Sequence, residues 1–317
     1  MAEISNRSTP LHGGRSKTQT VLKRLKESRQ LYLMLVIPVV FYIIFAYKPM
    51  YGVLIAFKQF NARVGIMGSK WVGFKWFEKF LYDPYFWRAV RNTLVLSVGG
   101  LLLTFPLPII FAFLLNELRS SGFKRVVQTI TYLPHFFSTM VVCGMVTNFL
   151  SRYGLINNAL AAIGFPRVAY LNEPSAFFWV YHLSGIWQSI GWGSILYLAA
   201  MTGVNQELYE VARLDGANRF QRAIHITLPA ILPTVSIQLI FACGGLLGSD
   251  SDKILLLYNS TTRETADTIA TYIYRYGIEQ SSFSLSTAAG LFSSVIGLII
   301  LLCVNKASKT IGGTGLF

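Results

Sequence analysis

Six apolar stretches, each long enough to cross a lipid bilayer as a helix, are the feature that most limits what this chain can fold into. A hydrocarbon core of about 30 Å takes roughly twenty helical residues to cross. The alternating ten-residue segments typical of a membrane β-barrel do not occur in the sequence. We therefore expect an all-α membrane protein with six transmembrane helices, at residues 31–47, 89–115, 125–149, 176–201, 230–248 and 284–304.

Composition excludes a soluble globule. Hydrophobic residues make up 53% of the 317 residues, charged residues only 13%, and the mean hydropathy is +0.49. A soluble domain carries about 25% charged residues. This chain has too little polar surface to cover a water-exposed fold, and it is too apolar to remain disordered.

The net charge is +14, and the positions of the basic residues fit a membrane protein. The basic residues flank the apolar stretches and form no patch, so we expect contact with anionic lipid headgroups and no nucleic-acid partner. Seven basic residues precede the first stretch, and Lys306 and Lys309 follow the last. The positive-inside rule then places both termini in the cytoplasm of a bacterial plasma membrane. The chain divides into a cytoplasmic tail (1–30), a transmembrane domain (31–304) and a second tail (305–317).

The loop between the first two stretches departs from this charge rule. Residues 48–91 are basic although the topology puts them outside, which long loops tolerate. Their many aromatic rings favour an interfacial helix at the level of the headgroups. Prolines inside the stretches should kink or break their helices; they are Pro38, Pro106, Pro108, Pro134, Pro229 and Pro233.

The sequence contains few residues in patterns typical of catalysis, disulfides or metal binding. The three cysteines lie inside apolar stretches with no C-x-x-C spacing, so neither disulfides nor a zinc site is indicated. We expect no catalytic, cofactor-binding or metal-binding residue, and no enzyme activity. An ion-coupled secondary transporter of a small polar solute is the alternative that remains, and it needs titratable groups inside the membrane. Only His135 and His182 qualify.

The loop between the fourth and fifth stretches, residues 204–229, is the most informative segment. Asn205 is a good N-cap for a short helix with Glu207 in its first turn, and Asp215-Gly216 should end that helix. A second short helix follows, and Leu228-Pro229 should turn the chain into the membrane. The pattern predicts a helix–turn–helix whose apolar face suits docking on a partner or packing on its own bundle.

This loop closely resembles the E-A-A…G…I-x-L-P signature of the permease subunits of bacterial ATP-binding-cassette (ABC) importers. The match runs through Glu210, Ala212, Asp215-Gly216-Ala217 and Ile226-x-Leu228-Pro229, with Val211 and Ala223 as departures. The resemblance implies a type I ABC importer permease fold with cytoplasmic coupling helices. It also implies that the following residues couple the chain to an ATPase: Glu210, Val211, Ala212, Arg213, Asp215, Gly216, Ala217, Leu228 and Pro229.

Further segments resemble the carbohydrate branch of these importers, the maltose-type and LplB-like permeases. They are Leu35-Val-Ile-Pro38, Tyr47-Lys-Pro-Met-Tyr-Gly52, Asn92-Thr-Leu94 and Tyr132-Leu-Pro134. The branch implies oligosaccharide import by alternating access, a second homologous permease forming a heterodimer, two copies of a cytoplasmic ATPase and an extracellular solute-binding lipoprotein. The chain has no G-x-x-x-x-G-K-[ST] motif, so we expect ATP and Mg²⁺ on the partner ATPase.

The fourth stretch carries the side chains that bind sugars, namely aromatic faces beside amides and hydroxyls. Ser184, Gln188 and Trp192 recur at i, i+4 and i+8 and should share one stripe. Similarity to the maltose permease implies a substrate pathway near Gln188, Ser189, Trp192, Leu246 and Ser249. Pectin-derived or other acidic saccharides would suit the basic outer loop, but lysines that flank a membrane more usually contact lipid phosphates.

Overall fold

The computed structural model describes residues 28–248 and 250–312, and these residues are almost entirely helical. The chain divides into two units, Met1–Leu54 and Ile55–Phe317. Most of the predicted tail 1–30, residue Ser249 and residues 313–317 of the second predicted tail lie outside the described residues.

The first unit is a long apolar helical segment. It consists of α2 (Arg29–Tyr42), a wide π-helical turn η1 (Ile43–Tyr47) and α3 (Lys48–Met50), and the 3₁₀ segment η2 (Tyr51–Phe57) begins in it. Pro38 lies inside α2 without ending it, and no residue of α2 is buried. The predicted first membrane helix, 31–47, is present and is longer than expected.

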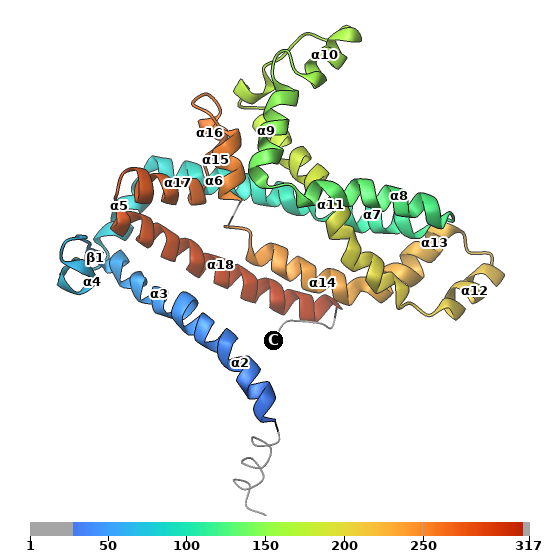
Figure 1. Ribbon diagram of the computed structural model, residues 1–317, viewed down its shortest axis with the longest axis horizontal. Helices are drawn as coiled ribbons and strands as arrows, with labels where there is room; N and C mark the ends of the chain where they lie inside the picture. Colours follow the sequence, from blue (N-terminus) through green and yellow to red (C-terminus); the bar gives the residue numbers. More distant parts are fainter. Residues whose placement is uncertain (1–27, 249, 313–317) are drawn as a thin grey trace, which may run out of the picture. The chain divides into compact units, whose positions relative to one another are not determined.

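The second unit begins with a hairpin and continues as a helical bundle (Figure 1). In the hairpin β1 (Lys58–Gln59) pairs antiparallel with β2 (Lys70–Trp71), with Lys58 opposite Trp71. The helices up to residue 172 are α4 (Gly65–Gly68), α5 (Lys75–Leu81), α6 (Pro84–Gly99), η3 (Gly100–Thr104), α7 (Pro106–Asn116), α8 (Ser121–Tyr132), η4 (Leu133–Phe136), α9 (Thr139–Leu150), α10 (Leu155–Ala162) and η5 (Tyr170–Asn172). The later ones are α11 (Phe177–Thr202), α12 (Gln206–Leu214), α13 (Arg219–Arg222), η6 (Ala223–Thr227), α14 (Leu228–Gly244), α15 (Ser251–Leu257), α16 (Arg263–Ala266), α17 (Ile269–Tyr274), η7 (Arg275–Glu279) and α18 (Phe283–Gly312).

Length and composition identify the membrane-crossing elements. Within the described ranges, four continuous helices qualify: Arg29–Phe57, Pro84–Asn116, Arg219–Gly244 and Phe283–Lys309. The pair Ser121–Phe136 and Thr139–Ala162 adds a fifth if it counts as one broken span. α11 is the remaining predicted span. Its 26 residues reach about 39 Å, but its tryptophans, serines and glutamine leave it less apolar than the others.

The third predicted helix, 125–149, is not one continuous helix. The chain bends by 103° between Phe136 and Thr139. Pro134 sits in a short 3₁₀ turn that closes α8, and Ser138 then caps α9 by accepting a hydrogen bond from the backbone N–H of Val141. A proline followed by a good N-cap residue favours two helices over one, a consequence that hydropathy alone does not reveal.

Three other prolines follow a π-helical turn and leave their helices unbroken. η1 precedes Lys48-Pro49, η3 precedes Phe105-Pro106, and η6 precedes Leu228-Pro229. Proline supplies no N–H and crowds the carbonyl four residues earlier. A wide turn just before it removes that conflict and lets the helix continue.

Glycines set the closest helix contacts of the bundle. A Cβ on Gly191 would lie 2.2 Å from the Thr131 carbonyl oxygen, so α11 approaches α8 as only glycine permits. Similarly, a Cβ on Gly244 would lie 2.5 Å from Leu301, where α14 runs beside α18 (Figure 1). Glycine therefore sets the spacing of the helices at these two positions.

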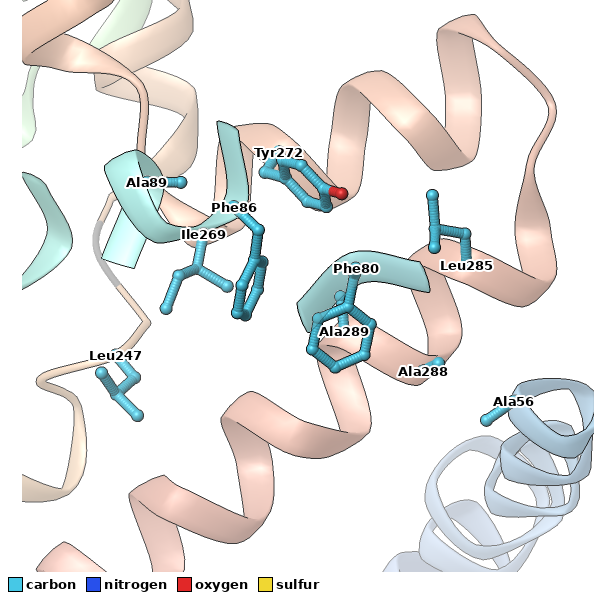
Figure 2. Close-up of a cluster of buried hydrophobic side chains, with 10 residues drawn as sticks. All are labelled: Ala56, Phe80, Phe86, Ala89, Leu247, Ile269, Tyr272, Leu285, Ala288 and Ala289. Atoms are coloured by element: carbon cyan, nitrogen blue, oxygen red, sulfur yellow. The ribbon is translucent and has the colours of Figure 1, made fainter. Parts of the chain in front are cut away.

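The aromatic loop expected to anchor in the headgroups contributes to the core instead. Phe80 and Phe86 are fully buried with ring centroids 4.6 Å apart, and Tyr272 packs on Phe86 at 5.5 Å. Figure 2 shows these rings gathered in one cluster with Ile269 and Leu285. The interfacial prediction was therefore wrong for the buried rings, although others in the loop, Trp71 among them, remain exposed.

A polar network ties the segment after α14 to α6. The Asn92 amide donates to the carbonyl oxygens of Glu264 and Asp267 at 2.8 and 3.0 Å. Asp267 forms a buried ion pair with Arg275 at 2.6 Å. The Tyr272 hydroxyl donates to Asp83 at 2.8 Å, and burial, followed by this carboxylate, raises the pKa of Tyr272. The bonds of Asn92 and Tyr272 hold α16 and α17 against α6.

Candidate functional site

A cavity of about 630 Å³ opens among α6, η3, α7, α11, α14 and α15. Small-ligand pockets commonly measure about 300–1,000 Å³. Polar side chains from five of these elements, all but α7, reach its wall, with apolar and aromatic groups between them. The polar members include Ser97, Thr104, His182, Gln188, Ser189, Gln238, Asp250 and Lys253.

Three of the predicted substrate-pathway residues line this cavity. Gln188 and Ser189 contribute from α11 and Leu246 from the segment after α14. The Ser97 hydroxyl donates to the Leu246 carbonyl oxygen, which fastens that segment to α6. Ser249 lies outside the described residues. The structure thus brings together residues that are about 58 positions apart in sequence, through the helix packing described above.

Trp192 does not line the cavity. Its indole stacks on the His135 ring, with centroids 4.4 Å apart and planes 5° apart, beside the break between α8 and α9. Gln188 also touches this break, because its amide donates to the Phe137 carbonyl oxygen at 3.2 Å. The two side chains therefore support the bend as well as the face of α11.

The predicted stripe Ser184–Gln188–Trp192 is not the cavity face of α11. Ser184 is buried and donates to the Val180 carbonyl oxygen, and it faces a separate apolar hollow beside α9. The cavity face runs instead through Tyr181, Gly185, Gln188 and Ser189. Sequence spacing predicts which residues of α11 share a face but not which face turns inward, since its polar residues are spread around the helix.

Sequence reasoning missed several polar groups of the wall, Gln238 and Lys253 among them. Gln238 is the one amide inside the apolar α14 run, and that isolation was an available signal. Lys253 lies between the fifth and sixth apolar stretches of the sequence, yet it is only 3% exposed. Its signal was a single lysine at the head of the apolar run Ile254–Leu257.

Residues 204–229, called the coupling loop from here on, contain the predicted first helix and the predicted turn after it. Asn205 accepts a hydrogen bond from the Glu207 backbone N–H at 3.0 Å and caps α12. Gly216 has φ +80°, and the N–H groups of Gly216 and Ala217 donate to the carbonyl oxygens of Arg213 and Ala212. This is the Schellman motif, in which a glycine with positive φ follows the helix and two backbone N–H groups donate to carbonyl oxygens of the last turn.

The predicted turn at Leu228-Pro229 was wrong. Asn218 starts the second helix with a capping box to Gln221, and the chain continues through η6 into α14 as one helix, Arg219–Gly244. The π-helical turn before Pro229 accommodates the proline, as explained above. The second coupling helix is therefore the first part of a membrane helix.

The surface of this loop is exposed and apolar. Leu208, Val211, Leu214 and Phe220 are 51%, 56%, 88% and 73% exposed. A hollow of about 360 Å³ lies on the inner side of the turn between α12 and α13. It is lined by Ala212, Asp215, Gly216, Ala217, Gln221, Arg222, His225 and Ile226. Exposed apolar groups with a charged rim around a hollow are typical of a docking surface.

Two contacts connect the loop to the bundle. The Tyr209 and Thr227 hydroxyls are hydrogen-bonded at 2.7 Å, which joins α12 to the buried turn before α14. Arg219 lies 3.7 Å from the Glu117 carboxylate at the end of α7. The second pair is exposed and adds little stability, whereas the first links the coupling helix directly to a membrane helix.

The two histidines considered for proton coupling lack the required partners in the described structure. His182 is buried, its Nδ1 lies 3.5 Å from the Thr104 hydroxyl, and its Nε2 has no hydrogen-bond partner there. His135 stacks on Trp192. Among the described residues no carboxylate pairs with either ring, and no group of three metal-ligating side chains occurs.

Known proteins resemble the chain closely. Protein LplB of Bacillus subtilis is 43% identical over 294 residues, covering 92% of each chain. The polygalacturonan/rhamnogalacturonan transport system permease protein YteP of the same species is 39% identical and covers 96% of this chain and 95% of its own. The crystal structure of a bacterial alginate ABC transporter, in complex with alginate pentasaccharide-bound periplasmic protein, contains a chain that is 43% identical, with a TM-score of 0.86. The match covers 93% of this chain and 99% of that one.

Family membership distinguishes the two transport classes left open by the sequence. Residues 104–309, which contain both the cavity wall on α11 and α14 and the coupling loop, match the family described as binding-protein-dependent transport system inner membrane component. Such a component works with a binding protein and not as an ion-coupled carrier. The chain belongs to this family and is a permease subunit of the ABC importer class.

Proposed function

We propose that this chain forms one half of the translocation pathway of an ATP-driven importer of acidic oligosaccharides. The observation that carries the proposal is the continuous helix Arg219–Gly244. Its first part, residues 219–229, belongs to the coupling loop, and its last turns bring Gln238, Phe241 and Ala242 to the cavity. The turn at Asp215-Gly216-Ala217, between α12 and α13, is called the docking turn. A movement at this turn would reach the cavity wall through one rigid element.

Uronic acid oligosaccharides are the substrates best supported. Polygalacturonan and alginate, in the names of two close relatives, are polymers of sugar acids. The cavity offers aromatic faces from Tyr181 and Phe241 for sugar C–H surfaces, and amides from Gln188 and Gln238 for hydroxyls. This mixture of stacking and hydrogen bonding suits saccharides.

The partners follow from what the chain lacks and what its surface offers. It has no phosphate-binding glycine loop, so two copies of a cytoplasmic ATPase would bind ATP and Mg²⁺. The coupling residues from Glu210 to Ala217, with Leu228 and Pro229 behind them, would dock there. A second, homologous permease would supply the other half of the cavity. A binding lipoprotein would deliver the sugar, as a periplasmic protein accompanies the alginate transporter.

The mechanism is alternating access with both termini in the cytoplasm. Closure of the two ATPases on ATP would draw the coupling helices together and rock the helices that carry the cavity. The wide turn next to Pro106, outside the helix Arg219–Gly244, is a natural point for that bending. The cavity would open first to the binding protein and then to the cytoplasm.

Affinity purification of the tagged chain from native membranes in a mild detergent tests the assembly. We expect recovery of a second six-helix permease and an ATPase with a Walker motif, identified by mass spectrometry. A variant with Leu214→Asp on the exposed face of α12 should lose the ATPase and keep the second permease, because a charge at an apolar contact opposes docking. Recovery of the chain with no ATPase, while the loop is intact, would contradict the proposal.

A further inference from the structure

A buried lysine lies in the wall of the cavity. Lys253 is 3% exposed, and its Nζ donates to the Tyr181 carbonyl oxygen at 3.0 Å. The ammonium also lies 5.0 Å from the centre of the Tyr181 ring. Buried lysines are rare unless they are paired or functional.

The ammonium is under-satisfied in the described structure. It has three N–H donors, and among the described residues the Tyr181 carbonyl oxygen is the one acceptor that it reaches. Neither ion pair described, Arg219–Glu117 or Arg275–Asp267, includes it. Asp250 is exposed, and its carboxylate accepts the Lys253 backbone N–H at 3.4 Å and not the ammonium.

The backbone that carries Lys253 is held firmly. Asp250 caps α15, and Ile254 and Leu257 are buried in a cluster with Leu96 and Cys143. Across the wall, a Cβ on Gly185 would lie 3.1 Å from the ammonium. The glycine therefore leaves room at the point where the charge meets the cavity, so a ligand group can approach it.

Burying an ammonium with spare donors is costly unless a partner arrives. A carboxylate is the partner that best repays this cost, because charge-assisted hydrogen bonds are roughly twice as strong as neutral ones. A neutral sugar hydroxyl would leave the charge uncompensated. The cavity thus combines a fixed cation with the amide of Gln188 and the hydroxyl of Ser189 on the same face.

We infer that Lys253 binds the carboxylate of a sugar acid in the translocation cavity and makes this subunit selective for uronate-containing oligosaccharides over neutral ones. The inference rests on the proposed function and adds the residue that reads the substrate's charge. The basic outer loop considered in the sequence is not required for it.

The test compares one substrate with and without its charge. The complete importer, with its binding protein, is reconstituted in vesicles, and uptake of trigalacturonate is compared with uptake of its methyl ester at matched length. For Lys253→Met we expect the apparent KM for the acid to rise by about tenfold or more, the effect of losing one charge-assisted hydrogen bond, with the ester unchanged. Lys253→Arg should retain the preference for the acid. Lys70→Met, at an exposed lysine of β2, is the matched control and should behave as wild type.

Two outcomes would overturn the inference while leaving the proposed function intact. One is unchanged uptake of the acid by Lys253→Met. The other is an equal loss of acid and ester, which would make Lys253 a structural support for Tyr181. Failure of the wild-type importer to take up either trisaccharide under ATP would instead contradict the proposed function.

A second measurement needs no charge-removing variant. Burial lowers the pKa of Lys253 to about 8, against smaller opposite effects of Cys143 and Asp250. The ammonium therefore predominates below pH 8 and is lost above it, so the KM ratio of acid to ester should rise between pH 7 and pH 9. Tyr181 and His182 on α11, Cys143 on α9 and Asp250 also face this region. In Lys253→Arg the ratio should stay flat, because guanidinium does not titrate in this range; a rise there would assign the effect to another group and overturn the inference.

Discussion

At the residue scale, the absence of a side chain decides how closely the helices of this bundle pack. Gly191 lets α11 press against the backbone of α8, near the bend that Gln188 and Trp192 support. Gly216 has a different role, because its positive φ ends α12 and sets the direction of the docking turn. The first glycine was recognisable in the sequence only as one of several in α11, whereas the second had the signature of a helix cap.

Gly191→Val should destabilise the chain by about 1–3 kcal/mol, the usual cost of overpacking. The added carbons have no space, since the first would lie 2.2 Å from the Thr131 carbonyl oxygen. Gly144→Ala in α9 is the control, because no atom lies within 4 Å of its added Cβ. Thermal unfolding in detergent should show a lower Tm for Gly191→Val alone. Equal Tm values for the two variants would contradict the close α8–α11 contact.

Gly216→Val should weaken binding of the ATPase and leave the bundle folded. A β-branched residue at φ +80° is strained by about 1–2 kcal/mol and would displace the docking turn. Gly164→Val is a matched control, because Gly164 has φ +92° with open space around it and lies outside the coupling loop. Co-purification with the ATPase should fall for Gly216→Val only. A similar fall for both variants would show general damage and not a docking role.

At the scale of elements, the coupling loop and the membrane helices are less separate than the sequence suggests. Proline usually ends a helix, so Leu228-Pro229 was expected to turn the chain, but the π-helical turn η6 carries the helix through it. The opposite occurred at Pro134, where the predicted helix 125–149 breaks. Whether a proline breaks a helix depends on the hydrogen bonding of the turn before it and on the cap after it. A hydropathy profile gives no information about either.

The Tyr209–Thr227 hydrogen bond should transmit movement from α12 to the helix that reaches the cavity. Tyr209→Phe removes one hydroxyl from a half-buried contact of 2.7 Å, worth about 1 kcal/mol or a fivefold change. We expect ATP hydrolysis to persist while sugar uptake per ATP falls by up to about fivefold. Tyr153→Phe, at an exposed tyrosine before α10, should leave that ratio unchanged. Unchanged coupling in Tyr209→Phe would rule out this contact as the link.

At the scale of the whole molecule, hydropathy was enough to predict the class of fold, and the loop signature was enough to predict the family. Gln188, Ser189 and Leu246, expected along the substrate pathway, line one cavity, and their contact with substrate stays a prediction. The inward face of α11 and the burial of Lys253 depend on how distant segments pack, and these were beyond local patterns. Lys253 reaches the wall because its neighbours Ile254 and Leu257 in α15 are buried in a cluster with Leu96 and Cys143.

The central claim is that this chain moves sugar only as part of an ATP-driven complex. The most direct measurement is uptake of a labelled uronate oligosaccharide into vesicles that contain the chain with its partner permease, ATPase and binding protein. We predict uptake that requires internal or external ATP on the ATPase side and stops when the ATPase is omitted. Uptake by the chain without any ATPase, driven by an ion gradient, would contradict the account.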